Sequence, residues 1–152
     1  MNGEISIYYN QKKLSMRDYQ KLDVWKKAHL FTLHVYKEIL PLMPPDEKFA
    51  LTQQIRRATY AIPLNIVEGC GKNTEKDFAH YLDNALGSTK EVEYAFILIA
   101  DLGYINQETY TIVNQKVNEV KAMLIGFLKF LRKGIMDDNL HPSSLPPSNL
   151  SK

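Results

Sequence analysis

The sequence predicts an all-α protein, an antiparallel up-down-up-down four-helix bundle formed by a single domain. Apolar residues recur at steps of three and four along four long segments, which is the period of helices that bury one face. Clusters of proline or glycine separate these segments by short connections, as antiparallel neighbours in a bundle require. With 152 residues, 45% of them hydrophobic, the chain is long enough to bury one sizeable core.

The first helix is predicted to run from Asp23, its expected N-cap, to about Leu40. Pro41, Pro44 and Pro45 follow, and proline ends a helix because it has no backbone N–H to donate. The residues at helical spacing on its apolar face are Val24, Ala28, Phe31, Val35 and Ile39.

The second helix is predicted to start after Asp46, its expected cap, and it carries Pro63 in its interior. An internal proline removes one backbone hydrogen bond and kinks a helix, so we expect a bend near Tyr60. Gly69 and Gly71 bracket the predicted stop, because glycine adopts the left-handed C-cap conformation without a steric penalty. The apolar face consists of Leu51, Ile55, Ala58, Ile62 and Ile66.

Two longer helices complete the predicted bundle. Thr74, with Asp77 three residues later, is a variant capping box that starts the third helix, and Gly103 ends it. Asn106 caps the fourth helix, which is predicted to end at Gly134. Their apolar faces alternate steps of four and three: Phe78, Leu82, Ala85, Thr89, Val92, Phe96 and Ile99, then Tyr110, Val113, Val117, Val120, Leu124, Phe127 and Leu131.

The chain divides into a weakly ordered N-terminal arm at 1–16, the bundle at 17–134, and a Pro/Ser-rich tail at 135–152 that is predicted to be disordered. Cys70 is the only cysteine, so no internal disulfide can form, which fits a reducing compartment. The N-terminus lacks the pattern of a signal peptide, and no apolar run approaches the ~18 residues of a membrane span. We therefore expect a soluble, cytoplasmic protein with no membrane contact.

Two segments break the one-sided pattern, because Tyr94–Ala100 (YAFILIA) and Ala122–Leu128 (AMLIGFL) are apolar on every side of their helices. A helix that is apolar all round is buried all round, whereas each helix of a lone bundle keeps a solvated face. The segments therefore predict a second burial surface, most simply a subunit interface. The alternative is that the N-terminal arm or the C-terminal tail covers them.

No catalytic constellation, cofactor motif or metal site can be assembled from the spacing of the residues. Gly71 and Lys72 match the end of a phosphate-binding loop, but Ile66 stands where that motif needs glycine and Asn73 where it needs Ser or Thr. The four histidines have no ligand spacing, and Cys70 has no identifiable base partner. We expect a protein that is not an enzyme and needs neither a cofactor nor a metal.

Two polar groups have more than one interpretation. His80 with Asp77 and Asp83 forms either a carboxylate and histidine site or a solvated helix face, and their three-residue steps favour the solvated face. Glu68 and Asn65 lie near the apolar side of the second helix, where they belong either to a functional site or to a buried hydrogen-bond network. The network is the favoured interpretation.

Clustered cations are the most suggestive feature of the sequence. The net charge is only +2, so any attraction to nucleic acid must come from local patches. Repeated around an oligomer, adjacent cations would form rings of positive charge; the alternative is that they are scattered surface cations paired with carboxylates. The candidate nucleic-acid-binding residues are Arg56, Arg57, Lys72, Lys76, Lys26 and Lys27.

Four blocks of the sequence resemble one known family. They are Asp18–Trp25 (DYQKLDVW), Gln53–Ala58 (QQIRRA), Ile62–Gly69 (IPLNIVEG), and Gly87-Ser88 with Glu91. Together they are similar to the four-helix-bundle family of intervening-sequence proteins, which are encoded within insertions in bacterial 23S ribosomal RNA genes. The resemblance covers about residues 17–133. The same family includes the accessory variability determinant of diversity-generating retroelements, a helper bound to a reverse transcriptase and its RNA.

The resemblance implies a left-handed four-helix bundle assembled as a barrel-like homopentamer, with no known enzymatic activity and a role in binding nucleic acid. The chain departs from the family pattern at Ala61, where a small polar residue is usual, at Ala50, where glycine is frequent, and at Lys72, where arginine is common. The retroelement helper is expected to be markedly basic, so the net charge of +2 favours the intervening-sequence branch.

Two functions remain open at this level. The first is a non-enzymatic oligomer that binds structured RNA, or DNA, by neutralising phosphates with little reading of bases. The second is a protein interaction scaffold, or an accessory subunit for a partner enzyme such as a retroelement reverse transcriptase. The near-neutral net charge is the reason for keeping the second.

Overall fold

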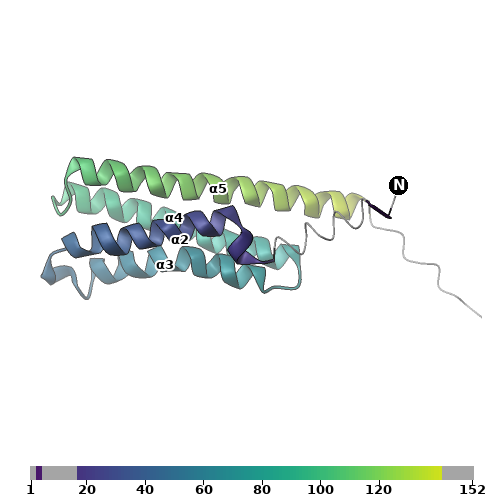
Figure 1. The fold of residues 1–152 in the computed structure, drawn as a ribbon, viewed down its shortest axis with the longest axis horizontal. Coiled ribbons are helices and arrows are strands. Elements are labelled where there is room, and N and C mark those ends of the chain that lie inside the picture. The colour runs from purple at the N-terminus through teal and green to yellow at the C-terminus, as the bar shows by residue number, and fades with distance from the viewer. Residues whose placement is uncertain (1–2, 5–16, 142–152) are drawn as a thin grey trace, which may run out of the picture.

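The computed structural model describes residues 3–4 and 17–141, which form helices and turns and no strand (Figure 1). The predicted all-α class is confirmed for this part of the chain. Its four long helices are α2 (Asp23–His34), α3 (Leu51–Cys70), α4 (Glu75–Asp101) and α5 (Gln107–Leu140). Most of the predicted arm, and residues 142–152 of the predicted tail, lie outside the described residues.

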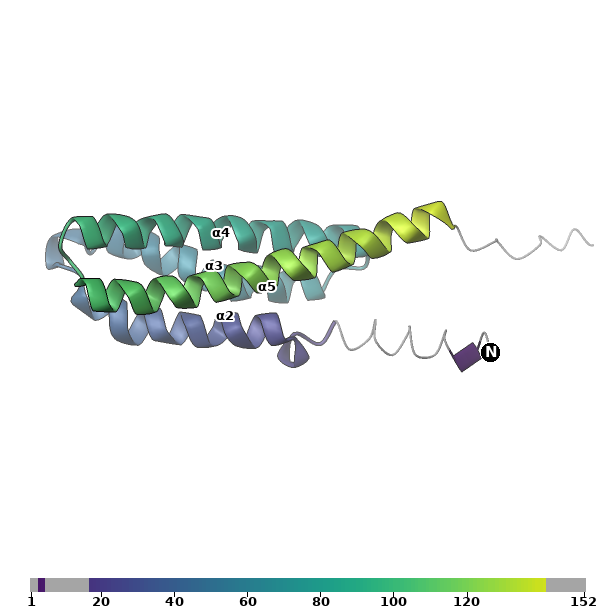
Figure 2. The same ribbon diagram turned by 90° about the horizontal axis from the view of Figure 1, so that it is seen from above.

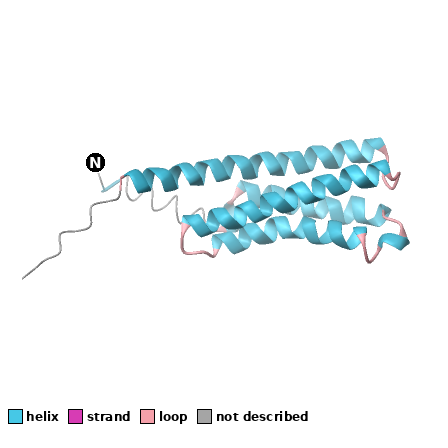
Figure 3. Ribbon diagram, turned by 180° about the vertical axis from the view of Figure 1, so that it is seen from behind, coloured by secondary structure: helices cyan, strands magenta, loops and turns pink. Residues whose placement is uncertain are grey.

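The four helices pack side by side around one core. α3 packs along α4 and α4 along α5, while α2 contacts both α3 and α5. Figure 3 shows the connections gathered at the two ends of the bundle, and Figure 2 shows the last part of α5 extending beyond the other helices. Within the described residues, no helix has the length and mean hydropathy needed to cross a membrane.

The first helix begins at Asp23, as predicted, but Asp23 is not its cap. Leu22 occupies the N-cap position and makes no side-chain hydrogen bond there. Asp18 instead caps the short 3-10 turn η1 (Tyr19–Lys21) by accepting a backbone hydrogen bond of 3.2 Å. After α2 the winding changes to a π-helical turn and then a 3-10 turn, η2 (Val35–Ile39) and η3 (Leu40–Leu42). The helical path therefore ends among the prolines, as expected.

The second helix begins five residues after Asp46, and the cap predicted at Asp46 is wrong. An additional 3-10 turn, η4 (Pro45–Glu47), separates the prolines from α3, which starts only at Leu51. Glu47 takes the capping role, since its Oε2 accepts a hydrogen bond of 3.2 Å from the Leu51 N–H. A carboxylate in this position also complements the positive end of the helix dipole.

Gly69 and Gly71 bracket the end of α3, as predicted, but the left-handed conformation predicted there is wrong. α3 runs unbroken through Pro63 to Cys70, and Gly71 at its C-cap has a φ of −80°, in the right-handed region. Gly69 is buried inside the helix, and a Cβ atom there would lie 2.6 Å from Cδ2 of Phe78. Gly69 is therefore explained by the close approach of α4 rather than by the end of α3.

The caps predicted for the two longer helices are confirmed. The Thr74 hydroxyl accepts a hydrogen bond of 3.1 Å from the Asp77 N–H, and the Asn106 side-chain oxygen accepts one of 2.8 Å from the Thr109 N–H. α4 ends just before Gly103, whose φ of +76° lies in the left-handed region that glycine adopts without penalty.

The fourth helix passes through Gly134, which was predicted to end it. α5 continues to Leu140, so residues 135–140 belong to the helix and not to the tail. A glycine inside a helix costs only about 1 kcal/mol relative to alanine, and the next residue, Ile135, is half-buried against the start of α4. A single glycine does not stop a helix whose following turn still has an apolar side chain to pack.

The predicted apolar faces form the core. Every residue assigned to the faces of the first and third helices is buried. Those of the second and fourth are buried too, apart from Leu51, Tyr110 and Phe127, which are partly buried against the same core. An edge-to-face contact of 6.2 Å between the rings of Phe31 and Phe96 joins α2 to α4 across it.

The two segments that are apolar on every side carry exposed side chains. In Tyr94–Ala100, Tyr94 is 63% and Ile97 41% exposed, and in Ala122–Leu128, Ala122 is exposed. The described part of this chain therefore does not supply the second burial surface. That surface stays a prediction.

Candidate nucleic-acid interface

Arg56 and Arg57 are adjacent in the first half of α3 but face different neighbours. The guanidinium carbon of Arg56 lies 6.0 Å from the centre of the Tyr36 ring, in the turn η2 that contacts α3. Arg57 is exposed and lines a hollow shared with the end of α4. Neither arginine forms an ion pair with the residues that the structure describes. Both charges therefore remain available to an anion.

The hollow beside Arg57 has a volume of about 580 Å³ and lies between the turn before α3, the first turns of α3 and the end of α4. Phe49, in that turn, is 83% exposed, and the ammonium nitrogen of Lys48 lies 5.3 Å from the centre of its ring. Glu47 holds the turn in place, because its Oε1 accepts a hydrogen bond of 3.3 Å from the Tyr104 hydroxyl in addition to the cap at α3.

Lys72 and Lys76 lie at the opposite end of α3 from the arginine pair. At 1.5 Å per residue, Arg57 and Lys72 are about 22 Å apart along the helix direction. The ammonium nitrogen of Lys72 lies 4.9 Å from the centre of the Tyr81 ring. Lys76 lines a second hollow, of about 450 Å³, together with Ala79, His80, Asp83, Arg132, Ile135 and Asn139. The structure thus places Lys76 near Arg132 and away from the arginine pair.

Lys26 and Lys27 of α2 differ in their surroundings. The ammonium nitrogen of Lys27 lies 2.7 Å from Oε2 of Glu119 on α5. That hydrogen bond and the lysine charge hold the pKa of Glu119 below its usual value. Lys26 is exposed and has no ion pair within the described ranges. The α2 pair therefore offers one uncompensated cation rather than two.

The remaining polar groups do not converge on one point within the described residues. Cys70 is buried, and burial raises the pKa of its thiol to about 11, far from the range of a reactive thiolate. Asn65 donates a hydrogen bond of 2.8 Å to the Ala61 carbonyl of its own helix and Glu68 is exposed, so the predicted buried network is wrong. His80 is exposed. No cluster of three His, Cys, Asp or Glu residues in this part of the chain could hold a metal ion.

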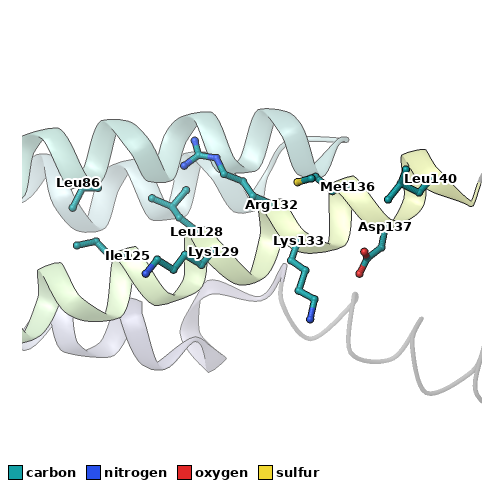
Figure 4. A pocket seen from close by; sticks show the side chains of 9 residues that line it. All are labelled: Leu86, Ile125, Leu128, Lys129, Arg132, Lys133, Met136, Asp137 and Leu140. Carbon is teal, nitrogen blue, oxygen red and sulfur yellow. The ribbon is translucent and has the colours of Figure 1, made fainter.

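An apolar groove of about 470 Å³ follows α5 where it passes α4 and continues beyond it (Figure 4). The lining residues are Leu86, Ile125, Leu128, Lys129, Arg132, Lys133, Met136, Asp137 and Leu140. Met136 and Leu140 are 63% and 71% exposed and belong to the turns that the sequence did not assign to the helix. Arg132 is paired with Asp83 of α4. The groove is an exposed apolar surface with charged residues along its rim.

Sequence reasoning missed Phe49, the most exposed large hydrophobic residue of the described chain. A signal was present, because Phe49 stands between the prolines and Leu51, off the apolar face of α3 and next to Lys48. An aromatic residue that no helical face accounts for, beside a cation, is a candidate contact for a ligand or a partner. Its place in the hollow with Arg57 required the added turn η4, which the sequence did not reveal.

Four packed helices, with candidate sites on the outer surface rather than in an enclosed cavity, define an all-helical protein. The chain belongs to the family of 23S rRNA-intervening sequence proteins, whose family model matches residues 20–126. The resemblance found in the sequence blocks is confirmed.

Several solved chains are similar to this one, and one of them matches over most of its length. It is the crystal structure of a protein with unknown function from the S23 ribosomal protein family of Bacteroides thetaiotaomicron VPI-5482. The two chains are 27% identical, the match covers 70% of this chain and 98% of that one, and the TM-score is 0.65. Comparison with curated proteins finds no match. These likenesses establish the family and its helical fold and leave the function open.

Proposed function

We propose that this protein is a non-enzymatic, oligomeric helical-bundle protein that binds structured RNA through the arginine pair of α3. The observation that carries the proposal is the arginine pair, Arg56 and Arg57, which has no carboxylate partner within the described residues. Arg57 is exposed and Arg56 half-buried; charges at the surface contribute little to folding, so an anionic ligand explains adjacent unpaired arginines better than stability does. Arginine also suits phosphate, because its planar guanidinium can donate two parallel hydrogen bonds.

The mechanism is neutralisation of phosphates. Each arginine that contacts a phosphate releases condensed counterions, which is the main source of affinity for such proteins. The ring of Tyr36, 6.0 Å from the guanidinium carbon of Arg56, helps to hold that side chain through a cation–π contact. A single chain of net charge +2 attracts RNA weakly, and an oligomer multiplies the effect by presenting several arginine pairs at once.

The proposed assembly is a cytoplasmic, barrel-like homopentamer of antiparallel up-down-up-down bundles. Short turns between helices that pack along each other, as in α3–α4 and α4–α5, support the topology. Exposed apolar side chains support self-association, because a second copy would bury them. Examples are Leu64 on α3 (54% exposed) and Tyr94 on α4 (63%).

The test is RNA affinity, measured by fluorescence anisotropy with a labelled RNA hairpin at low salt. The double variant Arg56→Ala/Arg57→Ala is compared with Lys90→Ala/Lys129→Ala, which removes the same charge from exposed positions elsewhere. Hydrogen bonds to charged groups contribute about 1.5–3 kcal/mol each, so we expect the arginine variant to bind at least about tenfold more weakly while the control stays close to wild type. Equal losses in both variants would mean that net charge, and not this surface, governs binding.

A second candidate function is a scaffold or accessory subunit for a partner enzyme, such as a retroelement reverse transcriptase. The apolar groove along α5 favours it, because a continuous exposed apolar surface is typical of protein contacts. Heparin chromatography separates the two candidates. Retention well beyond that expected from a net charge of +2 per chain supports RNA binding. Weak retention of a protein that still forms its oligomer supports the scaffold.

A further inference from the structure

We infer that the hollow at the start of α3 takes an unpaired nucleotide of the RNA, with its base stacked on the ring of Phe49. The inference rests on the proposed RNA binding and names the part of the RNA that this surface recognises. The ligand class is a nucleotide in a loop, bulge or single-stranded end. A nucleotide inside a duplex does not qualify, because both faces of its base are already stacked.

Phe49 is placed as a stacking platform. Its ring is 83% exposed and sits in a turn rather than on the apolar face of a helix, so it contributes little to the core. Two cations accompany it: Lys48, with its ammonium nitrogen 5.3 Å from the ring centre, and Arg57, which lines the same hollow. An exposed aromatic ring beside cations is the combination that binds single-stranded nucleic acid, where the ring stacks on a base and the cations contact its phosphates.

The hollow supplies the other contacts that a nucleotide needs. Its volume of about 580 Å³ lies within the ~300–1,000 Å³ of small-ligand sites. Leu98 of α4 and Leu102 at its C-cap give it an apolar side. Gln53 is exposed, and its amide makes no hydrogen bond to the described residues, so it is available for the edge of a base. The neighbouring Gln54 is not, because its amide donates to Glu91.

The one carboxylate in the hollow does not oppose an anionic ligand. Oε2 of Glu47 accepts from the Leu51 N–H at 3.2 Å, and Oε1 accepts from the Tyr104 hydroxyl at 3.3 Å. The charge of Glu47 is thus directed at the positive end of the α3 dipole and at the Tyr104 hydroxyl. The same two hydrogen bonds fix the turn that carries Phe49, so little conformational freedom is lost when a base stacks on it.

The experiment compares two RNAs of equal length and charge, a hairpin with an unpaired loop and a blunt duplex. Wild type, Phe49→Leu, Phe49→Trp and Leu30→Ala are each titrated with both RNAs by fluorescence anisotropy, and light scattering gives the mass of each variant. Phe49→Leu keeps an apolar side chain but removes the ring, Phe49→Trp keeps a ring, and Leu30→Ala removes an exposed apolar side chain from α2 as the matched control.

Stacking of one base on an aromatic side chain corresponds to about a 5- to 150-fold change in affinity. We expect Phe49→Leu to lose affinity for the hairpin by a factor in that range while its affinity for the duplex is unchanged. Phe49→Trp should bind the hairpin like wild type, and its added tryptophan emission should be quenched by the loop RNA only. Leu30→Ala should bind both RNAs like wild type.

Three results would overturn the inference in distinguishable ways. If wild type binds neither RNA, the proposed function fails and this inference fails with it. If wild type binds hairpin and duplex equally and Phe49→Leu changes neither, the proposed function stands and only the unpaired-nucleotide site is rejected. If Phe49→Leu changes the mass of the assembly, Phe49 is a contact between subunits.

Discussion

The packing of α3 against α4 predicts that Gly69→Ala destabilises the protein, although alanine is the better helix former. The added Cβ atom would lie 2.6 Å from Cδ2 and 3.1 Å from Cε2 of Phe78, and 3.1 Å from Cβ of Tyr81. The Phe78 ring has little room to move, because it is 2% exposed and packs edge-to-face on Phe127 with ring centres 5.6 Å apart. One helix must therefore shift relative to the other.

The magnitude follows from two opposing effects. Overpacking a core by one methyl group costs about 1–3 kcal/mol, while replacing a helical glycine by alanine gains up to about 1 kcal/mol. The net expectation is a loss of about 1 kcal/mol, which lowers Tm by roughly 2–4 °C in a chain of this size. Thermal melts followed by circular dichroism measure it, at two protein concentrations because assembly shifts the apparent stability.

Gly126→Ala is the matched control for this prediction. Gly126 lies inside α5, and a Cβ atom there would meet nothing within 4 Å. Its replacement should stabilise the protein by about 0.5–1 kcal/mol through helix propensity alone. If Gly69→Ala stabilised the protein as much as Gly126→Ala does, the close approach of α3 and α4 would be refuted.

Three further predictions concern a helix cap, the cysteine and a surface ion pair. Thr74→Ala removes the hydrogen bond to the Asp77 N–H and should cost about 1 kcal/mol in urea denaturation; no loss would mean that the cap is not formed in solution. Burial raises the pKa of the Cys70 thiol from 9.0 to about 11, so Cys70 should react with iodoacetamide at pH 8 about 100-fold more slowly in the native than in the unfolded chain. Mass spectrometry follows the reaction, and equal rates in the two states would contradict the burial of Cys70. Lys27 lowers the pKa of Glu119 in the folded protein, so the stabilising contribution of Glu119 is present above pH 4.5 and is lost as the pH falls through the lowered value. In acid titrations of the free energy of unfolding, Glu119→Gln should lack this part of the pH dependence. Identical curves for wild type and variant would argue against the ion pair.

Periodicity was sufficient to predict the helices and the core, because each apolar face repeats along its whole helix. Phe78, Leu82, Ala85, Val92 and Ile99 are all buried as their spacing predicts. Long amphipathic helices can bury their faces in few ways other than a bundle, so the fold class follows from the pattern alone.

The ends of the helices were harder to predict, because single residues there have more than one possible role. Gly103 and Gly134 are the same residue type near the end of an apolar repeat, yet only Gly103 takes a positive φ. Gly69 looked like a stop signal and is instead a point of close packing between two helices. A role that depends on a residue of another helix, here Phe78, cannot be read from local sequence.

The candidate site was predicted in part. Arg56 and Arg57 were identified by their adjacency alone, but their different surroundings, the Tyr36 ring for Arg56 and a hollow for Arg57, depend on tertiary contacts. Lys27 was expected to offer a charge, and its pairing with Glu119 of α5 depends on the tertiary contact between two helices. Phe49 was missed because its position depends on an irregular turn, which has no periodic signal.

The salt dependence of RNA affinity for wild type and Arg56→Ala/Arg57→Ala tests the central proposal most directly. Log affinity for the hairpin is plotted against log salt concentration, and each phosphate contact contributes about 0.7–0.9 to the slope. Removing two arginines should make the slope shallower by about 1.4–1.8 for every subunit that contacts the RNA. An unchanged slope in the arginine variant, with RNA still bound, would contradict the assignment of this surface as the RNA-binding site.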